Sequence, residues 1–401
     1  MKNRILLSAS LFHALTDATT TVVPMAFPLL YAGGGLLRSY TQIGLLSYLG
    51  LLSTLLIQFL VVKVSFHVEY RVLLLFSFLG ICASMAAIPF ATSFLTLLFL
   101  FLSLRLFASF YHPIIIAWVA KSRTAGDLDL AMGIQSGSGN FGVLLAFVSF
   151  GYLAQHWNWK MPLFAWAGFG ILVGGAGWIV LRGISSKVDD RPSLGVTSWM
   201  KVLGSIRHLI PGFVFGGMGW SVIIYYAPSL LTHQFSVPIG RTGLYLALWI
   251  GLGTIAGYCY GAISRRFGRR NVFLVSIGAG ALSLAAIGFA PGRTMAVAGL
   301  LGFGVTLLMT YPSLHTFVGS SVPRGDQTQA FSWVSNIQIL AGALISLLAG
   351  VLSDRFGIRA PFVLSFVIAV VCFVFYAVPG ELPSRLEKTV SEAPPVVEPG
   401  A

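Results

Sequence analysis

Twelve long apolar stretches follow one another along the chain, separated only by short polar turns. Each holds about 20 residues, the length that an α-helix needs to cross the hydrocarbon core of a bilayer. Only 9% of the residues are charged, whereas soluble domains have roughly 25%. The sequence therefore predicts an all-α integral membrane protein with twelve transmembrane helices. We place them at 5–31, 41–62, 71–92, 94–118, 129–153, 161–182, 206–232, 241–263, 271–291, 294–318, 329–351 and 360–380.

Basic residues in the loops indicate how the chain is oriented. Lysine and arginine are concentrated in the loops on the side of the N-terminus, as in the loop with Arg265, Arg266, Arg269 and Arg270. Cytoplasmic loops of membrane proteins have such an excess. We therefore expect a multi-pass protein of the inner (plasma) membrane with both termini in the cytoplasm. The net charge of +13 then reflects topology, and without a basic soluble face we expect no nucleic-acid partner.

An internal repeat divides the chain into two halves. Residues 151–162 align without gaps with residues 350–361, an offset of 199, and Pro113 matches Pro312 at the same offset. We expect two parallel six-helix halves at 1–183 and 206–380, joined by a cytoplasmic linker at 184–205 and followed by a disordered tail at 381–401. Parallel halves are a known transporter plan, in which the substrate site lies between them near the middle of the membrane.

Away from the ends of the predicted helices there are two charged side chains, Asp17 in the first helix and Arg105 in the fourth. Ionisable groups at this depth cost at least about 2.5–3.5 kcal/mol and commonly mark functional sites. Both lie near the middle of their helices, so we expect an ion pair or two charges that face one aqueous cavity. His13 lies one turn before Asp17 on the same helix face. His112 continues the polar stripe of Arg105, and Pro113 after it predicts a kink.

We assign Asp17, Arg105, His13 and His112 to proton coupling, because a buried carboxylate near an arginine can change its protonation state as a cavity opens. The alternative is a structural ion pair, with both histidines bonded to backbone carbonyls. The second half has no titratable counterpart. We expect aromatic and amide side chains to contact the substrate, although aromatics near helix ends are also typical interfacial anchors. These candidates are Tyr111, Gln135, Asn140, Trp220, Tyr225, Tyr226, Trp249, Tyr311 and Trp333.

Twelve helices in two parallel halves resemble the major facilitator superfamily. The segment from Gly261 to Arg270 resembles the loop signature of that superfamily, with Arg265 at the position of its aspartate. A closer resemblance is to the fosmidomycin-resistance group of drug exporters, and Arg105 takes the place of the arginine that proton-coupled exporters carry in the fourth helix. The motifs that carry it are His13-Ala-Leu-Thr-Asp17 with Pro24 and Pro28, Tyr111-His112-Pro113, and Gly139-Asn-Phe-Gly142.

The resemblance implies proton antiport by alternating access, with efflux of a small drug-like or metabolite molecule and hence drug resistance. The residues alone leave a second hypothesis open, a facilitator or proton-coupled importer of a small organic anion that Arg105 binds. No catalytic constellation, nucleotide loop or metal-ligand spacing is evident, so we expect no enzyme, no metal site and no cofactor beyond the proton gradient. The expected partners are a small-molecule substrate, protons and the lipid bilayer, and the expected state is a monomer.

Overall fold

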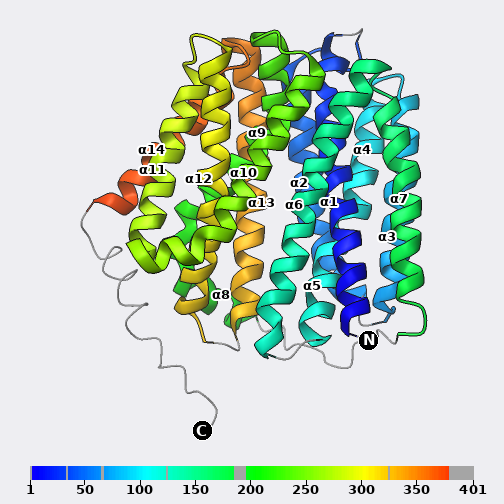
Figure 1. Ribbon diagram of the computed structural model, residues 1–401, viewed down its shortest axis with the longest axis vertical. Coiled ribbons are helices and arrows are strands. Elements are labelled where there is room, and N and C mark those ends of the chain that lie inside the picture. Colours follow the sequence, from blue (N-terminus) through cyan, green and yellow to red (C-terminus); the bar gives the residue numbers. More distant parts are fainter. Residues whose placement is uncertain are drawn as a thin grey trace.

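The computed structural model describes residues 2–32, 35–64, 67–122, 125–184, 196–323 and 326–378. Long helices stand side by side in one bundle (Figure 1), and no described residue belongs to a β-strand. The first half contains α1 (Lys2–Ala32), α2 (Tyr40–Val64), α3 (Tyr70–Ala87), η1 (Ile88–Phe90), α4 (Phe94–Ala108), α5 (Tyr111–Ser122), α6 (Ala125–His156) and α7 (Met161–Val180). The second half contains α8 (Val196–Ile206), η2 (Arg207–Leu209), α9 (Ile210–Ser229), η3 (Leu230–Gln234), α10 (Ile239–Phe267), α11 (Arg269–Gly288), α12 (Arg293–Ser321), α13 (Gln327–Phe356) and α14 (Ala360–Ala377).

These helices confirm the predicted twelve-helix fold. Eleven helical segments of the described chain are long and apolar enough to cross a membrane. The twelfth is α1, which packs against α6 and α7 inside the first half. Its middle carries His13, Asp17 and several threonines, which makes it less apolar than its neighbours.

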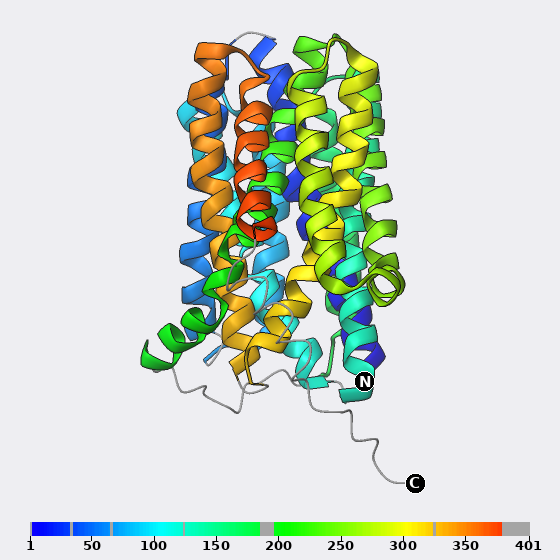
Figure 2. The same ribbon diagram turned by 90° about the vertical axis from the view of Figure 1, so that its left-hand side faces the viewer.

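Two ends of the bundle are distinguished below. The end at which α1 begins, beside the N label in Figures 1 and 2, is called the proximal end. The end at which α1 stops and α2 starts is called the distal end. The loop charges predict that the proximal end faces the cytoplasm.

The fourth span is interrupted where the sequence predicts a kink. Helix α4 ends at Ala108 and α5 begins at Tyr111. Pro113 has no N–H to bond the carbonyl of Ser109 four residues earlier, so the helical ladder cannot run through this point. The break places His112 at the start of a new helix, and Arg105 remains in the last turn of the previous one.

Part of the segment that we expected to join the two halves is helical. Residues 196–206 form α8, in which Val202 and Ile206 are buried whereas Met200 and Lys201 are exposed. The indole Nε1 of Trp333 in α13 donates to the carbonyl of Trp199 at 3.0 Å, so α8 is attached to the second half. The rest of the predicted linker up to residue 195, and the predicted tail at 381–401, lie outside the described residues.

The two halves meet along four helix pairs, α2–α13, α6–α10, α1–α9 and α2–α9. Within the first half, α1 and α6 approach closely because glycines of α6 face α1. A Cβ added to Gly142 would lie 2.1 Å from the carbonyl oxygen of Ala14. This contact brings the middle of α1, with its titratable side chains, directly against α6.

Candidate functional site

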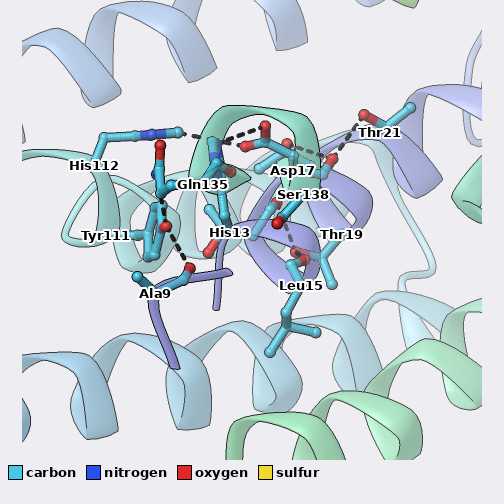
Figure 3. A network of polar contacts seen from close by, with 12 residues as sticks. Ala9, His13, Leu15, Asp17, Thr19, Thr21, Tyr111, His112, Gln135 and Ser138 are labelled. Atoms are coloured by element: carbon cyan, nitrogen blue, oxygen red, sulfur yellow. Dashed lines mark hydrogen bonds and ion pairs between the residues drawn. The ribbon is translucent and has the colours of Figure 1, made fainter. Parts of the chain in front are cut away.

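Three titratable side chains meet near the middle of the first half (Figure 3). His13 and Asp17 come from successive turns of α1, and His112 comes from the start of α5. The Nε2 atom of His13 lies 3.1 Å from Oδ2 of Asp17. On the other oxygen, Nε2 of His112 lies 3.4 Å from Oδ1. The carboxylate is therefore held between two imidazoles from two different helices.

The partner of the other His13 nitrogen shows where protons must lie. Nδ1 of His13 is 2.7 Å from the backbone carbonyl oxygen of Gln135. A carbonyl can only accept, so Nδ1 carries the proton of this bond. A neutral His13 would then turn the lone pair of Nε2 toward the carboxylate oxygen of Asp17, which would repel it. The 3.1 Å contact is attractive once a further proton lies between these atoms, so the geometry is that of a pair holding one proton.

A second layer of polar groups fixes the His13 ring. Tyr111 donates to the carbonyl of Ala9 at 2.7 Å and accepts from Nε2 of Gln135 at 2.9 Å. The Tyr111 ring stacks on His13 with centroids 5.1 Å apart. Tyr111 is 1% exposed and Gln135 is 3% exposed. In this conformation the two residues that we expected at the substrate hold the histidine in place.

Gly139 lets α6 pass directly over the cluster. A Cβ at this position would lie 2.6 Å from Oδ2 of Asp17 and 2.7 Å from Nε2 of His13. Those distances are far below van der Waals contact, so any side chain here would displace the pair. The absence of a side chain at Gly139 thus makes room for the His13–Asp17 pair.

Exposure gives the cluster an open face and a closed face. The side chain of Asp17 is 24% exposed and that of His112 is 37% exposed, whereas that of His13 is 9% exposed. Asp17 and His112 are therefore reachable from outside the packed helices, and His13 lies behind them. The cluster is therefore accessible on the side of Asp17 and His112 and enclosed on the side of His13.

Of the two arrangements expected for Asp17 and Arg105, the direct ion pair is wrong for the described side chains, and a shared aqueous cavity stays a prediction. The described carboxylate of Asp17 pairs with the two histidines instead. Nε of Arg105 points to the carbonyl of Gly50 in α2 at 3.5 Å. The physical reason is the position of α4, which packs beside α2 and turns Arg105 toward it. No ion pair links Arg105 to any carboxylate within the described ranges.

His13, Asp17 and His112 each have a nitrogen or oxygen atom that could bind a metal ion, and these three atoms lie within 4.8 Å of one another. Two imidazoles and one carboxylate are groups that a divalent ion could also use. The short His13–Asp17 contact, however, is that of two groups bonded to each other. The expected absence of a metal stays a prediction, as does the expected role of the cluster in proton coupling.

The aromatic candidates of the second half divide by accessibility. Tyr225 is 3% exposed, and Tyr226 and Trp249 are fully buried, so these three cannot reach a substrate in this conformation. The Tyr226 hydroxyl donates to the carbonyl of Ser346 at 2.5 Å. Tyr225 stacks on Phe27 of the first half, with centroids 6.3 Å apart.

The remaining candidates are partly exposed. Tyr311 donates to the carbonyl of Gly216 at 3.0 Å, and the ring of Trp220 lies 5.6 Å from that of Trp249. Trp333 lies at the proximal end against α8, and Asn140 lies partly exposed in α6. Their contact with a substrate stays a prediction.

Polar residues at the distal end were not among the expected sites. Nε2 of His233 donates to the carbonyl of Pro28 at 3.0 Å, and Nδ1 lies 3.0 Å from the hydroxyl of Tyr40. Asp354 accepts hydrogen bonds from the start of α2. His233 and Asp354 belong to the second half, and their partners belong to the first. The repeat could have pointed to Asp354, which aligns with Gln155 at the offset of 199.

Comparisons with known proteins agree with this architecture. The family model described as the Major Facilitator Superfamily matches residues 9–335 and, in a second match, residues 209–399. Among solved structures, a bacterial homologue of the human lysosomal transporter Spinster, inward-facing and unoccupied, is 16% identical with a TM-score of 0.80, and the match covers 97% of this chain and 98% of that one.

Two further solved structures have the same fold. The nucleoside transporter NupG is 15% identical with a TM-score of 0.74, covering 96% of this chain and 99% of that one. A POT family transporter in complex with a thioalcohol-conjugated peptide is 12% identical with a TM-score of 0.77, covering 92% and 94%. At these identities the similarity extends to the fold alone.

Proposed function

The chain belongs to the major facilitator superfamily of membrane transporters, and from that premise we propose that it exchanges incoming protons for an outgoing small molecule. The observation that carries this proposal is the His13–Asp17 pair, which needs one extra proton for its 3.1 Å contact. The pair is located in the membrane-spanning part of the chain, and Asp17 is partly exposed. A titratable group of this kind can load and release a proton during transport.

The charge of the His13–Asp17 pair explains why this site would couple the entry of protons to the exit of the small molecule. With the proton bound, His13 and Asp17 together are neutral; after its release the pair has one net negative charge. An uncompensated charge at this depth is costly unless water reaches it. The deprotonated site would therefore resist being enclosed between the halves, so reorientation of the empty transporter requires the proton.

His112 links this chemistry to helix movement. It contacts Asp17 from α5, whereas His13 is bonded to α6 through Gln135. Loss of the proton turns the Nε2 lone pair of His13 toward the Asp17 carboxylate, so these two side chains of α1, each in contact with a different neighbouring helix, repel each other. We infer that the protonation state changes the packing of α1, which also contacts α9 of the second half.

Arg105 favours a substrate with an acidic group. Its guanidinium forms no ion pair with a described carboxylate, and Nε makes only a long contact, at 3.5 Å, to a backbone carbonyl. An arginine with free donors near the middle of a membrane is suited to bidentate binding of a carboxylate or phosphate. The same observation supports the second candidate function, a facilitator or proton-coupled importer of a small organic anion.

The location follows from the loop charges and stays part of the proposal. The proximal end would face the cytoplasm of a cell with this protein in its inner membrane. The hydrogen bonds that join the halves through described residues lie at the distal end. This conformation would then be closed toward the outside, as expected for an inward-facing transporter, and we propose that the transporter works as a monomer.

Transport in proteoliposomes tests the proposal. A fluorescent organic anion and the cation ethidium serve as probes, with and without an imposed pH gradient, for the wild-type protein and for Asp17→Asn. We expect gradient-driven flux of the anion that Asp17→Asn abolishes. Flux that ignores the gradient in both proteins would contradict proton coupling. Each assay is repeated with a chelator, because a divalent ion on the cluster would make transport sensitive to EDTA.

Variants of Arg105 separate the two candidate functions. Arg105→Ala should weaken uptake of the anion roughly tenfold or more, since loss of a charged hydrogen bond costs about 1.5–3 kcal/mol. Arg105→Lys keeps the charge without the planar fork, so we expect it to restore part of the flux. If the wild-type flux has no pH dependence but Arg105→Ala abolishes it, the facilitator is the correct function.

A further inference from the structure

Two of the helix pairs that join the halves are related by the internal repeat, which makes each pair the counterpart of the other. Helices α2 and α13 form one seam, and α10 and α6 form the other. At the repeat offset of 199, α2 corresponds to α10 and α13 corresponds to α6. The two seams are therefore related by the internal repeat, and each joins one helix of the first half to one of the second.

Matching glycines allow close approach in both seams. In the first seam, a Cβ on Gly44 would lie 3.0 Å from the carbonyl oxygen of Ser346. In the second, a Cβ on Gly243 would lie 2.3 Å from the carbonyl oxygen of Phe147. Gly44 aligns with Gly243, and Phe147 aligns with Ser346.

A second glycine pair repeats this relation one turn further along. A Cβ on Gly350 would lie 2.6 Å from the carbonyl oxygen of Tyr40. A Cβ on Gly151 would lie 3.0 Å from that of Ile239. Because Gly151 aligns with Gly350 and Tyr40 with Ile239, both seams bring a helix start onto the last turns of the opposite helix.

In the first seam, a carboxylate of one half caps a helix of the other. Oδ1 of Asp354 accepts from the backbone N–H of Tyr40 at 2.7 Å, and Oδ2 accepts from that of Thr41 at 2.9 Å. Oδ2 also accepts from the Thr41 hydroxyl at 2.5 Å. Ser39 bonds the N–H of Gln42 locally at 3.2 Å, so Asp354 serves the N–H groups that α2 cannot pair itself.

The second seam has a neutral counterpart at the equivalent position. Oε1 of Gln155 accepts from the backbone N–H of Gly240 at 2.9 Å. Gln155 aligns with Asp354, and Gly240 aligns with Thr41. The residue before α10 is Pro238, which makes no side-chain cap. The starts of α2 and α10 therefore each receive a cap from the opposite half.

We propose that these two caps, Asp354 on α2 and Gln155 on α10, form a latch that keeps the distal end closed, with Asp354 as the stronger part. Separating the halves breaks three hydrogen bonds of Asp354 and leaves two N–H groups of α2 without partners. It breaks one bond of Gln155. A carboxylate also interacts favourably with the positive end of a helix dipole, which an amide does not. The latch acts on the opening of the halves and does not depend on proton coupling.

Distance measurements between spin labels test the latch. The labels are placed on Met161→Cys and Thr294→Cys, two exposed positions at the distal ends of the first and second halves. The background is a variant with Cys82, Cys259 and Cys372 replaced by alanine. In Asp354→Ala we expect the ratio of long to short distances to rise roughly tenfold or more, as the loss of hydrogen bonds to a charged group implies.

Matched variants rank the two caps. Gln155→Ala should raise the same ratio by less than Asp354→Ala, roughly threefold. Thr41→Val removes one hydroxyl bond, leaves both N–H bonds, and should shift the ratio least. Gln155→Glu keeps the length of the side chain, adds a charge, and should move the distribution toward short distances. This variant tests the latch even if Asp354→Ala does not fold.

Two results would overturn the proposal. One is an unchanged distance distribution in folded Asp354→Ala, which would show that apolar packing alone closes the distal end. The other is an equal or larger opening in Gln155→Ala, which would show that the charged cap is not the stronger one. Loss of proton coupling in Asp17→Asn with an intact response to Asp354→Ala would leave the latch valid.

Discussion

The middle of the first half and the middle of the second half share one architecture and differ in chemistry. At the repeat offset of 199, His112 aligns with Tyr311 and Gly139 aligns with Gln338. Asp17 aligns with Gly216 at that offset, or with Gly217 when Pro28 is matched to Pro228. The carboxylate of the first half is thus replaced by a glycine, and the glycine facing it is replaced by an amide.

Contacts in the second half repeat those of the first without a titratable group. Tyr311 reaches α9 and donates to the carbonyl of Gly216 at 3.0 Å, as His112 reaches Asp17 in α1. A Cβ on Gly216 would lie 3.1 Å from Nε2 of Gln338. The amide of Gln338 fills space that the Asp17 side chain fills in the first half. The comparison indicates that helix packing needs a polar group at this level, and that only the first half uses one that can bind a proton.

Removing His13 should have the largest effect on the chemistry that distinguishes the first half from the second. In His13→Gln the carboxylate of Asp17 loses its short contact, and the bond from His13 Nδ1 to the Gln135 carbonyl is lost as well. Asp17 keeps only the longer contact to His112, and removing one partner of a buried ion pair costs about 3–5 kcal/mol, so we expect gradient-driven flux to fall roughly 100-fold or more. Flux is measured in proteoliposomes, with Tyr311→Phe as the control in the second half. Normal driven flux in His13→Gln would show that the pair is structural.

Replacing His112 by its counterpart should have an intermediate effect. His112→Tyr makes the first half resemble the second at this position and removes the 3.4 Å contact to Asp17. A hydrogen bond to a charged group contributes about 1.5–3 kcal/mol, so driven flux should fall about tenfold. The dependence of flux on pH should shift as well, because one titratable group is lost. An unchanged pH profile would exclude His112 from proton transfer.

Filling Gly139 should lower stability, and a glycine of the same helix provides the control. Gly139→Ala pushes into the His13–Asp17 pair, and overpacking of this kind costs about 1–3 kcal/mol. Gly133 in α6 has open space around it, so Gly133→Ala should be neutral or stabilise by about 0.5–1 kcal/mol. Thermal unfolding in detergent measures both. Equal melting temperatures would contradict the packing described for Gly139.

The smallest effect is expected in the second half. Tyr311→Phe removes one neutral hydrogen bond, which contributes about 0.5–1.5 kcal/mol. Thermal stability should fall slightly, and the pH dependence of transport should stay as in the wild type. A shift in that pH profile would mean that the second half takes part in proton coupling.

The sequence was sufficient for the helices, for the two halves, and for the closeness of His13 and Asp17 on one helix face. Helix length and loop charge depend on local composition, and His13 and Asp17 are neighbours on one helix. The partner of Arg105 could not be predicted, because depth along a helix does not determine which neighbour a side chain faces. The packing of α4 on α2 decided that contact.

Two further features could not be predicted from the sequence, because they involve hydrogen bonds to backbone groups. The carbonyl of Gln135 places the proton on Nδ1 of His13, and every residue has such a carbonyl, so no sequence signal marks it. The caps by Asp354 and Gln155 depend on contacts between residues far apart in the chain. The repeat aligned these two positions, but their common role was evident only when both helix starts were seen beside them.

The break between α4 and α5 has a mechanical consequence. Arg105 lies in the last turn of α4 and His112 in the first turn of α5. The arginine and the histidine therefore belong to two helical segments that are connected at Ser109 and Phe110. Bending at this break can move Arg105 without moving His112, or the reverse. Under the proposed function, a single span of the membrane would then carry the anion-binding group on one segment and a proton-site group on the next.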